Sequence, residues 1–473
     1  MASKLTYIGG GGVRTPLVVF GVGEAAKELD AEELVLYDPD AERMKIMAAV
    51  GRAAVKMAGS NLKVREATSL ADAVDGSRFV MHSIRVGGID ARMQDEAACV
   101  RHGFCGQETT GVGGAAMAFR TVPVSIRHAQ EVAKRNPDAW FISFTNPAGL
   151  IAQAINDHTD AKAIGICDTP NHMFHRISRA LGVPYEQVEC DYVGLNHLGW
   201  IRKVTVNGED ITPTILASDE LLSKFYAVPM FDPTMVRALG MIPSEYLYFY
   251  YERSKALAMQ KRSGTTRGAE IQKLNGELLS DLARLASEDA TEKLVERYSS
   301  YLNRRSGSYM RVESKGGSAF DEVVDSMKWD PFRTAHGYHK VAINVMSALT
   351  GAKPASCVLN VRSAGAIDDL DPNEVAEMQC EVTENNIRPL PVGKLPDEVQ
   401  GLIHSVKGYE RAAIKAALAN ESVQRRKSLL LHPAIGEWGT TEGLDKDLLV
   451  GGVFGCDQSD DVGGCSDHVV GTP

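Results

Sequence analysis

The chain opens with the apolar run Leu5-Thr6-Tyr7-Ile8, followed at once by Gly9-Gly10-Gly11-Gly12-Val13-Arg14-Thr15-Pro16. The run is typical of a buried strand, and the glycines predict a tight loop that leads into a helix. Because glycine has no side chain, such a loop lets the backbone approach a pyrophosphate, whose charge faces the amides of the helix N-terminus. We therefore expect Gly9, Gly11 and Gly12 to bind a dinucleotide.

A second strand-like run, 34–36, is followed by Tyr37 and Asp38. A carboxylate at the end of the second strand can accept hydrogen bonds from a ribose 2′-hydroxyl, and it repels a 2′-phosphate. Asp38 therefore favours NAD over NADP. The glycine cluster alone would also fit an ordinary loop, so the prediction depends on strand, loop and acid together.

Strand-like and helix-like segments alternate along the first third of the chain, which predicts an α/β fold with a parallel sheet and right-handed crossovers. The predicted strands are 5–8, 34–36, 79–82, 140–144 and 163–166. Beyond about residue 193 long helical patterns, such as 235–253, mix with strands and predict an α+β region. The expected domains are a Rossmann-like NAD-binding domain over 1–193, an α+β domain for catalysis, substrate binding and oligomerisation over 194–450, and a flexible tail over 451–473.

Composition narrows the class of protein. With 473 residues and 44% hydrophobic content, the chain can bury a large core, and its net charge of -10 argues against broad nucleic-acid binding. A few arginines in a pocket can still oppose that charge and bind an anionic substrate. The sequence shows no signal-peptide pattern, no membrane-spanning run and no CxxC pair, so we expect a cytoplasmic protein with reduced thiols.

Several residues at expected strand ends can bind a substrate. Arg85 and Arg92 suit a phosphate or carboxylate through a bidentate fork, but either could instead pair with a nearby acid such as Glu96. Asn146 could bond a sugar hydroxyl or the cofactor, or it could simply form an Asn-Pro turn. Arg267 offers a further cation, which could equally be a solvated loop residue.

Cys167 and His197 form a second constellation. A thiolate and an imidazole make a site suited to Mn, Fe, Co, Ni or Zn, with open positions for substrate oxygens. Taken alone, each residue is more often part of a core than a metal ligand. Asp168 follows the cysteine and could cap the turn before Pro170. Tyr246 belongs to an aromatic stripe that would normally pack in a helix, although a tyrosine beside a metal can act as a base.

Taken together, these motifs resemble glycoside hydrolase family 4, the NAD- and divalent-metal-dependent glycosidases. The resemblance runs from residue 4 to about residue 438, and within the family the chain looks most similar to the 6-phospho-β-glucosidases. The motifs that carry it are 9–16, 85–92, 106–114, 145–147, 166–170, 194–200 and 243–251. It implies a lactate/malate dehydrogenase-like plan for the first domain, a homodimer or homotetramer, and the cofactors NAD and a divalent metal, first of all Mn²⁺.

The resemblance also implies roles and a mechanism. NAD⁺ takes a hydride from C3 of the sugar, a base removes the C2 proton, the aglycone leaves from C1, water adds, and the hydride returns. Cys167 and His197 would hold the metal and Tyr246 would be the base. Asp168 would protonate the leaving group. Gly9, Gly11, Gly12 and Asp38 would bind NAD, Asn146 the sugar, and the cations Arg85, Arg92 and Arg267 an anionic group on it.

Asp168 and Gly12 depart from the substrate assignment that Thr110 favours. Thr110 is typical of β-acting members, whereas Asp168 is more common in α-acting ones, and Gly12 stands where many relatives have a serine near the sugar phosphate. We expect a 6-phospho-β-glucoside, with α-glucosides, unphosphorylated glycosides and uronic acids as alternatives. A 2-hydroxy acid dehydrogenase and a non-catalytic NAD-binding module are the rival interpretations, but neither explains Cys167, His197 and Tyr246 together.

Overall fold

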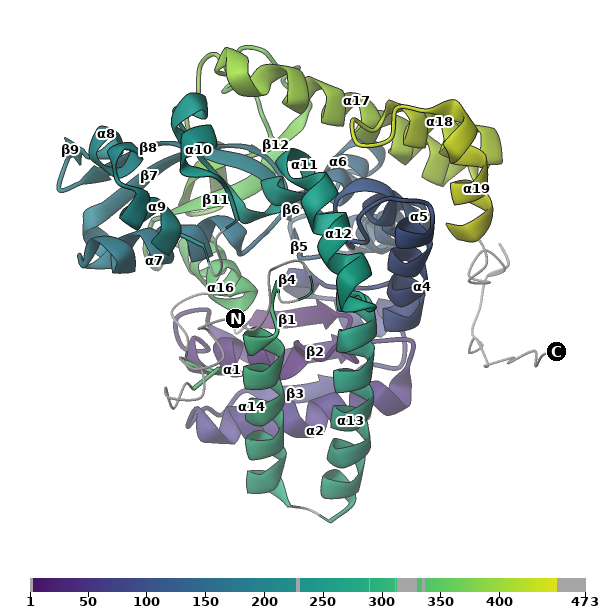
Figure 1. Cartoon of the computed structure of the whole chain (residues 1–473). Coiled ribbons are helices and arrows are strands. Elements are labelled where there is room, and N and C mark those ends of the chain that lie inside the picture. The colour runs from purple at the N-terminus through teal and green to yellow at the C-terminus, as the bar shows by residue number, and fades with distance from the viewer. Residues whose placement is uncertain are drawn as a thin grey trace.

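The computed structural model describes residues 3–226, 230–288, 290–310, 312, 330–333 and 337–448, so the predicted tail lies outside the described residues. Its strands are β1 (Ser3–Ile8), β2 (Ala31–Tyr37), β3 (Lys63–Glu66), β4 (Ser77–His82), β5 (Trp140–Ser143), β6 (Lys162–Gly165), β7 (Val188–Leu195), β8 (Leu198–Val206), β9 (Glu209–Asp210), β10 (Ile242–Pro243), β11 (Ala355–Arg362), β12 (Val375–Thr383) and β13 (Asn386–Pro389). The main path of strands in this part of the chain is β10-β8-β7-β12-β11-β6-β5-β4-β1-β2-β3 (Figure 1).

One half of the sheet is parallel, with the strand order β3-β2-β1-β4-β5-β6. This is the order of a dinucleotide-binding fold, and it confirms the predicted α/β class. The five predicted strands correspond to β1, β2, β4, β5 and β6. We did not predict β3, because its four residues, Lys-Val-Arg-Glu, form an edge strand without an apolar run.

The other half of the sheet is antiparallel, and its strands come from the later part of the chain. β11 joins β6 through the pairing of Asn360 with Gly165, and β12 pairs with β7 through Glu377 and Gly194. The sheet is therefore continuous from the parallel strands into β7 and β8. The boundary expected at residue 193 falls inside β7.

Helices pack around this sheet and on one another. They are α1 (Thr15–Glu24), α2 (Ala41–Met57), α3 (Leu70–Val74), α4 (Gly88–Arg101), α5 (Gly111–Arg135), α6 (Ala148–His158), α7 (Thr169–Leu181), η1 (Tyr185–Gln187), α8 (Thr212–Ala217), α9 (Asp219–Lys224), α10 (Pro233–Leu239), η2 (Glu245–Leu247), α11 (Tyr248–Tyr251), α12 (Arg253–Ser263), α13 (Arg267–Ser287), α14 (Thr291–Gly307), α16 (Tyr338–Leu349), α17 (Asp397–Ala419), α18 (Ser422–Leu431) and α19 (Trp438–Leu448). None of the helices in the described ranges has the length and apolar character of a membrane span.

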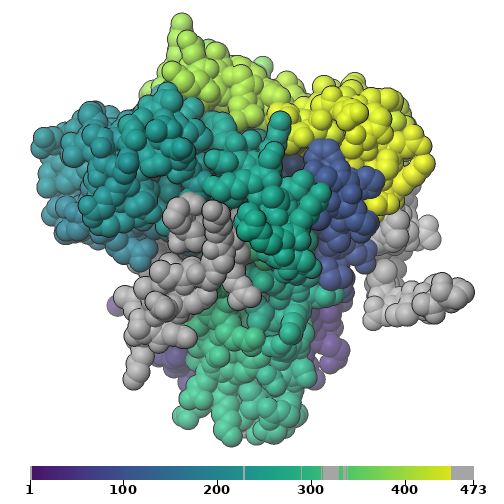
Figure 2. Space-filling model, in the orientation of Figure 1, coloured from purple at the N-terminus to yellow at the C-terminus, as the bar shows by residue number. Residues whose placement is uncertain are grey.

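Two late helical groups pack on the dinucleotide-binding half. α13 and α14 form a long hairpin that contacts α2 (Figure 1), and α17 lies along α5. The space-filling view shows the C-terminal helices, in yellow, against the blue segment that includes α4 (Figure 2). Because it contacts α2, the hairpin of α13 and α14 brings residues from beyond position 260 close to the first strands.

The helix predicted over 235–253 is wrong. α10 ends at Leu239 and is capped by Gly240, which has a φ of 65°, and Ile242 and Pro243 then pair with β8. Proline has no backbone N–H and breaks the helical hydrogen-bond pattern. As a result Tyr246 lies in the short 3₁₀ helix η2. The apolar residues whose spacing predicted one helix belong to several separate elements.

Candidate active site

The glycine loop lies between β1 and α1, against the end of β4. Gly9 has a φ of 103°, and a Cβ at this position would lie 2.0 Å from the carbonyl oxygen of Ser83. Glycine is therefore required here by both the backbone conformation and the available space. α1 begins at Thr15 with Pro16 in its first turn, where a fixed φ suits a helix start. The loop is the tight strand-loop-helix turn that the sequence predicts.

Asp38 follows β2 and lies against the glycine loop. Its Oδ2 accepts a hydrogen bond from the Gly11 backbone N–H at 2.9 Å, and its Oδ1 accepts one from the Asp40 N–H at 3.0 Å. Burial raises the pKa of Asp38, although both backbone N–H groups favour its charged form. The fold thus brings Gly9, Gly11, Gly12 and Asp38 together, and their binding of NAD stays a prediction.

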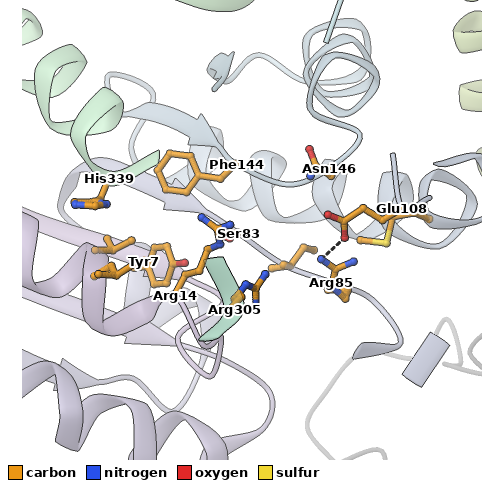
Figure 3. Close-up of a pocket in the computed structure, with 13 residues that line it drawn as sticks. Tyr7, Arg14, Ser83, Arg85, Glu108, Phe144, Asn146, Arg305 and His339 are labelled. Atoms are coloured by element: carbon orange, nitrogen blue, oxygen red, sulfur yellow. Dashed lines mark ion pairs between the residues drawn. The ribbon is translucent and has the colours of Figure 1, made fainter. Parts of the chain in front are cut away.

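A cavity of about 100 Å³ lies at the carboxyl ends of β1, β4 and β5 (Figure 3). Two predicted substrate residues, Arg85 and Asn146, line it. The lining also includes residues to which the sequence assigned no role: Tyr7, Arg14, Ser83, Glu108, Arg305 and His339. Ligands bind at this edge of open α/β sheets, so we expect the cofactor and the substrate to bind next to each other in this cavity.

Glu108 lies between two of the predicted substrate arginines. Its Oε2 is 2.6 Å from Arg85 Nη2 and 2.7 Å from Arg92 Nη1. Burial acts to raise the pKa of Glu108, but the two guanidinium groups hold it well below its usual value. Arg92 also pairs with Glu96 at 2.7 Å, as the alternative interpretation predicted. Arg85 retains a buried Nη1 that has no hydrogen-bond partner within the described ranges, so this nitrogen is available to an anion.

Arg267 lies at the start of α13, and its guanidinium group forms hydrogen bonds inside the protein. Its Nη1 donates to the Ser308 carbonyl at 2.9 Å, and its Nη2 donates to the Arg305 carbonyl at 2.8 Å. These bonds tie α13 to the end of α14, so Arg267 is not the solvated loop residue considered from the sequence. The cavity lining includes the neighbouring Arg305 and does not include Arg267.

Cys167 and Asp168 lie between β6 and α7. Cys167 is buried, and its Sγ is 3.4 Å from Thr169 Oγ1. Burial raises the pKa of this thiol well above its usual value. Asp168 is the N-cap residue of α7, but its side chain makes no capping hydrogen bond. The structure therefore does not support the interpretation of Asp168 as a capping residue.

His197 lies in the turn between β7 and β8 and has a φ of 60°, which is rare for a residue other than glycine. Its ring stacks on Tyr246, with centroids 3.6 Å apart and planes at 5°. Burial lowers the pKa of His197 to about 4, although the nearby carboxylates of Glu108 and Asp168 act to raise it. The imidazole is therefore neutral near neutral pH, which is the form that binds metals.

The two residues predicted to hold a metal have the side-chain types that a divalent metal binds. The Nδ1 of His197 is buried and has no hydrogen-bond partner in the part of the chain that the structure describes. Cys167 lies close enough to Tyr246 to influence the pKa of that phenol. Among the described residues no group of three or more His, Cys, Asp and Glu could hold a metal. A thiolate and an imidazole are chemically suited to a divalent metal, and the role of Cys167 and His197 as its ligands stays a prediction.

A buried carboxylate supports the segments that carry this pair. Glu377 on β12 is 1% exposed and accepts hydrogen bonds from Tyr192 at 2.7 Å, Asn360 at 2.9 Å and Asn196 at 3.2 Å. Asn196 directly precedes His197, and Asn360 lies opposite the end of β6. Hydrogen-bonded groups that lie behind metal ligands orient those ligands in metalloproteins, and Glu377 could do so for the predicted pair.

Sequence reasoning missed several of these residues for different reasons. Glu108 belongs to the recognised 106–114 motif, where an acid downstream of two arginines was a usable signal. Glu377 lies in a run of mixed polarity, and Arg305 and His339 lie on α14 and α16, far from any motif. Nothing in the local sequence marks these three, because only the fold brings them to the site.

Comparison with known proteins agrees with the geometry. Residues 4–183 match the model of the family 4 glycosyl hydrolases, and residues 192–435 match the model of the C-terminal domain of that family. The 6-phospho-beta-glucosidase of Escherichia coli (strain K12) is 29% identical over 462 residues, which cover 94% of each chain. The 6-phospho-beta-glucosidase BglT of Thermotoga maritima is 30% identical over 435 residues, which cover 91% of this chain and 94% of that protein.

One similar solved structure is that of the Thermotoga maritima 6-phospho-beta glucosidase with manganese, NAD⁺ and glucose-6-phosphate. It is 27% identical with a TM-score of 0.77, and the match covers 94% of this chain and 98% of that chain. An α-acting relative, the phospho-alpha-glucosidase PagL of Clostridium acetobutylicum, is 23% identical and covers 94% of this chain and 97% of that protein. The two family models together span most of the sequence, and the chain belongs to the family 4 glycosyl hydrolases.

Proposed function

We propose that this enzyme hydrolyses 6-phospho-β-glucosides in a redox-neutral reaction that uses NAD and a divalent metal, with Mn²⁺ as the metal to test first. The stacked pair of His197 and Tyr246 is the observation that carries the proposal, because it places a candidate metal ligand directly against a candidate base. The β-acting relatives from Escherichia coli and Thermotoga maritima support the choice of anomer, and the glucose-6-phosphate in the latter's structure supports a phosphorylated sugar.

When bound, NAD⁺ exchanges a hydride with C3 of the sugar, and the metal supplies Lewis-acid stabilisation of the C2 and C3 oxygens. Cys167 and His197 hold the metal. Tyr246 removes the proton from C2, which the C3 ketone has made acidic. Asp168 gives a proton to the leaving oxygen at C1. Water then adds to the unsaturated sugar and the hydride returns to C3, so the net reaction is hydrolysis.

The cavity residues bind the substrate. The unpartnered Nη1 of Arg85 suits a phosphate oxygen, and Arg14 and Arg305 add positive charge to the same lining. Asn146 lies at the end of β5, where its amide can bond a sugar hydroxyl. Arg92 acts through Glu108, which it holds in place beside Arg85.

An α-acting enzyme is the second candidate, and Asp168 favours it. Its side chain makes no capping hydrogen bond and its Oδ2 is 3.9 Å from His172 Nε2, so the carboxyl group, once protonated, can act as the acid. Thr110, which is typical of β-acting members, donates its hydroxyl to Gln107 Oε1 at 3.2 Å, so its side chain organises the loop before α5. The contacts of Thr110 therefore give no direct reason for a β preference.

Hydrolysis of paired p-nitrophenyl α- and β-glucosides, each with and without a 6-phosphate, tests the proposal. NAD⁺ and Mn²⁺ are each added or omitted. We expect release only from the 6-phospho-β-glucoside, only with both additions, and without accumulation of NADH. Release from the α-anomer would transfer the assignment to the second candidate. Steady NADH formation from a 2-hydroxy acid, without glycoside cleavage, would establish a dehydrogenase instead.

A further inference from the structure

His339 lies in the first turn of α16 and lines the cavity at the carboxyl ends of β1, β4 and β5. Its side chain is 5% exposed, and its Nε2 is buried without a hydrogen-bond partner among the residues that the structure describes. A buried polar atom without a partner is costly, and most such atoms in native proteins are satisfied. An unsatisfied nitrogen in a cavity wall therefore indicates a ligand group that bonds to it.

The packing of α16 on α1 holds this imidazole in place. A Cβ at Gly21 of α1 would lie 3.0 Å from His339 Cδ2 and 2.6 Å from Ile343 Cδ1, so the glycine gives the ring its space. Leu17 and Val18 lie about one helical turn before Gly21, on the same side of α1, and both line the cavity. His339 is thus a fixed polar group beside an apolar part of the lining.

The imidazole suits an uncharged ligand group. Burial lowers the pKa of His339 to about 3, so the ring is neutral near neutral pH, and its Nε2 donates or accepts according to the tautomer. Figure 3 shows His339 on the opposite side of the cavity from Arg85 and Glu108. The arginine suits a phosphate, which only accepts hydrogen bonds. A carboxamide carries both a donor and an acceptor, so it can pair with either tautomer of His339.

The position of the cavity relative to Asp38 indicates which half of a dinucleotide reaches His339. Asp38 follows β2, whereas the cavity lies at β1, β4 and β5, and β2 and β4 flank β1 on opposite sides. In folds of this kind the pyrophosphate lies at the glycine loop, and the acid after the second strand binds the adenosine ribose. A dinucleotide held in this way extends across the loop and places its nicotinamide half, with its one carboxamide, in the cavity.

We propose that His339 binds the nicotinamide carboxamide of the cofactor through its Nε2. This inference rests on the proposed function, in which NAD⁺ exchanges a hydride with C3 of the sugar. The carboxamide is attached to the ring carbon next to the one that exchanges the hydride. By holding the carboxamide, His339 limits rotation of the nicotinamide ring about its bond to the ribose and keeps one face of the ring toward the substrate.

Calorimetric titration of His339→Leu with NADH and with ADP-ribose tests the proposal. ADP-ribose retains the adenosine, the pyrophosphate and the second ribose but lacks the nicotinamide. We expect the Kd for NADH to rise by about tenfold, the effect of one lost hydrogen bond, and the Kd for ADP-ribose to change by less than about twofold. His339→Gln places an amide nitrogen close to the position of Nε2 and should restore most of the NADH affinity.

The matched control is His432→Leu. His432 is also a buried histidine whose Nε2 has no partner among the described residues, but the cavity lining does not include it. The control should bind both ligands as the wild type does. His339→Asn is the second variant if His339→Leu does not fold. Its amide is too short to reach the position of Nε2, so it should show the same selective loss of NADH affinity.

Wild-type affinity for NADH in His339→Leu or His339→Asn would overturn the proposal. An equal loss of affinity for NADH and ADP-ribose would also overturn it, because it would show a general disturbance of the site. Failure of the proposed function looks different, since the titrations contain no glycoside. A protein that shows the selective NADH effect but cleaves no glycoside would lose the proposed function and keep His339 as a cofactor-binding residue. Absence of NADH binding in the wild type would remove both.

Discussion

The rings of His197 and Tyr246 are stacked, with centroids 3.6 Å apart and planes at 5°. The contact joins the turn between β7 and β8 to η2, two segments separated by several helices in the sequence. It holds a phenol beside a neutral imidazole, so that the proposed metal ligand and the proposed base can act on adjacent carbons of one sugar. The first two predictions follow from this arrangement.

Replacing Tyr246 by phenylalanine keeps the ring stack and removes only the hydroxyl. We expect exchange of the substrate C2 proton with deuterium oxide to fall by about 10²-fold or more, the usual contribution of a positioned base. NAD binding, measured by NADH fluorescence, should be unchanged. Persistent C2 exchange in this variant would show that another group is the base.

Replacing Cys167 by serine removes the thiolate at the proposed metal site. We expect Mn²⁺ affinity, measured by electron paramagnetic resonance of the protein without substrate, to fall by at least about tenfold. Cys380→Ser is the control, because Cys380 is also a buried free cysteine but lies on β12 away from the pair. An unchanged Mn²⁺ affinity in Cys167→Ser would remove this residue from the site.

Replacing Gly9 by alanine should damage the dinucleotide loop. The new Cβ would lie 2.0 Å from the Ser83 carbonyl oxygen at a φ of 103°, so the backbone must shift. We expect a loss of about 1–3 kcal/mol in the free energy of unfolding, together with weaker NADH binding. Gly276→Ala on α13 has nothing within 4 Å, so it should leave NADH binding unchanged and, in the middle of a helix, should raise the free energy of unfolding by about 0.5–1 kcal/mol. Equal behaviour of the two variants would contradict the steric argument.

Replacing Glu377 by glutamine places an amide NH₂ group against side chains that already donate to the carboxylate. We expect the free energy of unfolding, from urea titration, to fall by about 1–3 kcal/mol, the cost of unsatisfied buried groups. Glu381→Gln is the control on the same strand, where an exposed ion pair with Arg388 contributes little. If both variants unfold at the same urea concentration, Glu377 does not hold the site together.

His432 makes stability depend on pH. Burial lowers its pKa from 6.5 to about 3, and its Nδ1 accepts a hydrogen bond from the Ala434 N–H at 3.1 Å. Between these pKa values the unfolded chain binds a proton that the folded protein excludes. Stability from this group is therefore complete above pH 6.5 and is lost as pH falls toward 3, with a slope of up to about 1.4 kcal/mol per pH unit.

The corresponding measurement compares unfolding free energies of wild type, His432→Asn and His404→Gln across this pH range. His432→Asn is expected to be less stable than wild type at neutral pH, but to lose less on acidification, because its amide does not titrate. His404→Gln changes an exposed histidine on α17 and should follow the wild-type profile. Parallel profiles for wild type and His432→Asn would refute the assignment.

Local patterns in the sequence were enough to predict much of the fold. The runs that form β1, β2, β4, β5 and β6 are apolar because both faces of a parallel sheet are buried, and this property belongs to each segment by itself. The loop at Gly9 and the acid at Asp38 were likewise predictable, because a turn of this kind imposes its requirements on adjacent residues. The order of the motifs was specific enough to identify the family.

The start of α5 shows where local reasoning stops. Helix propensity gives no reason to expect a helix at Gly111, Gly113 and Gly114, because glycine is a poor helix former. The structure begins the helix at Gly111, because Gly113 and Gly114 allow the preceding loop to pack on it: a Cβ at these positions would lie 2.2 Å from the Gln107 carbonyl oxygen and 2.0 Å from that of Thr109. A contact between loop and helix, rather than helix propensity, decided the boundary.

The composition of the site was decided by tertiary structure. The sequence alone determined the parallel sheet, the dinucleotide loop and the residue types needed for a metal and a base. Only the fold determined that Arg305 rather than Arg267 lines the cavity, and that Glu108 lies between two arginines. The physical reason is that side-chain charges and hydrogen bonds act over a few ångströms, and the segments that come within that distance are set by the packing of the whole chain.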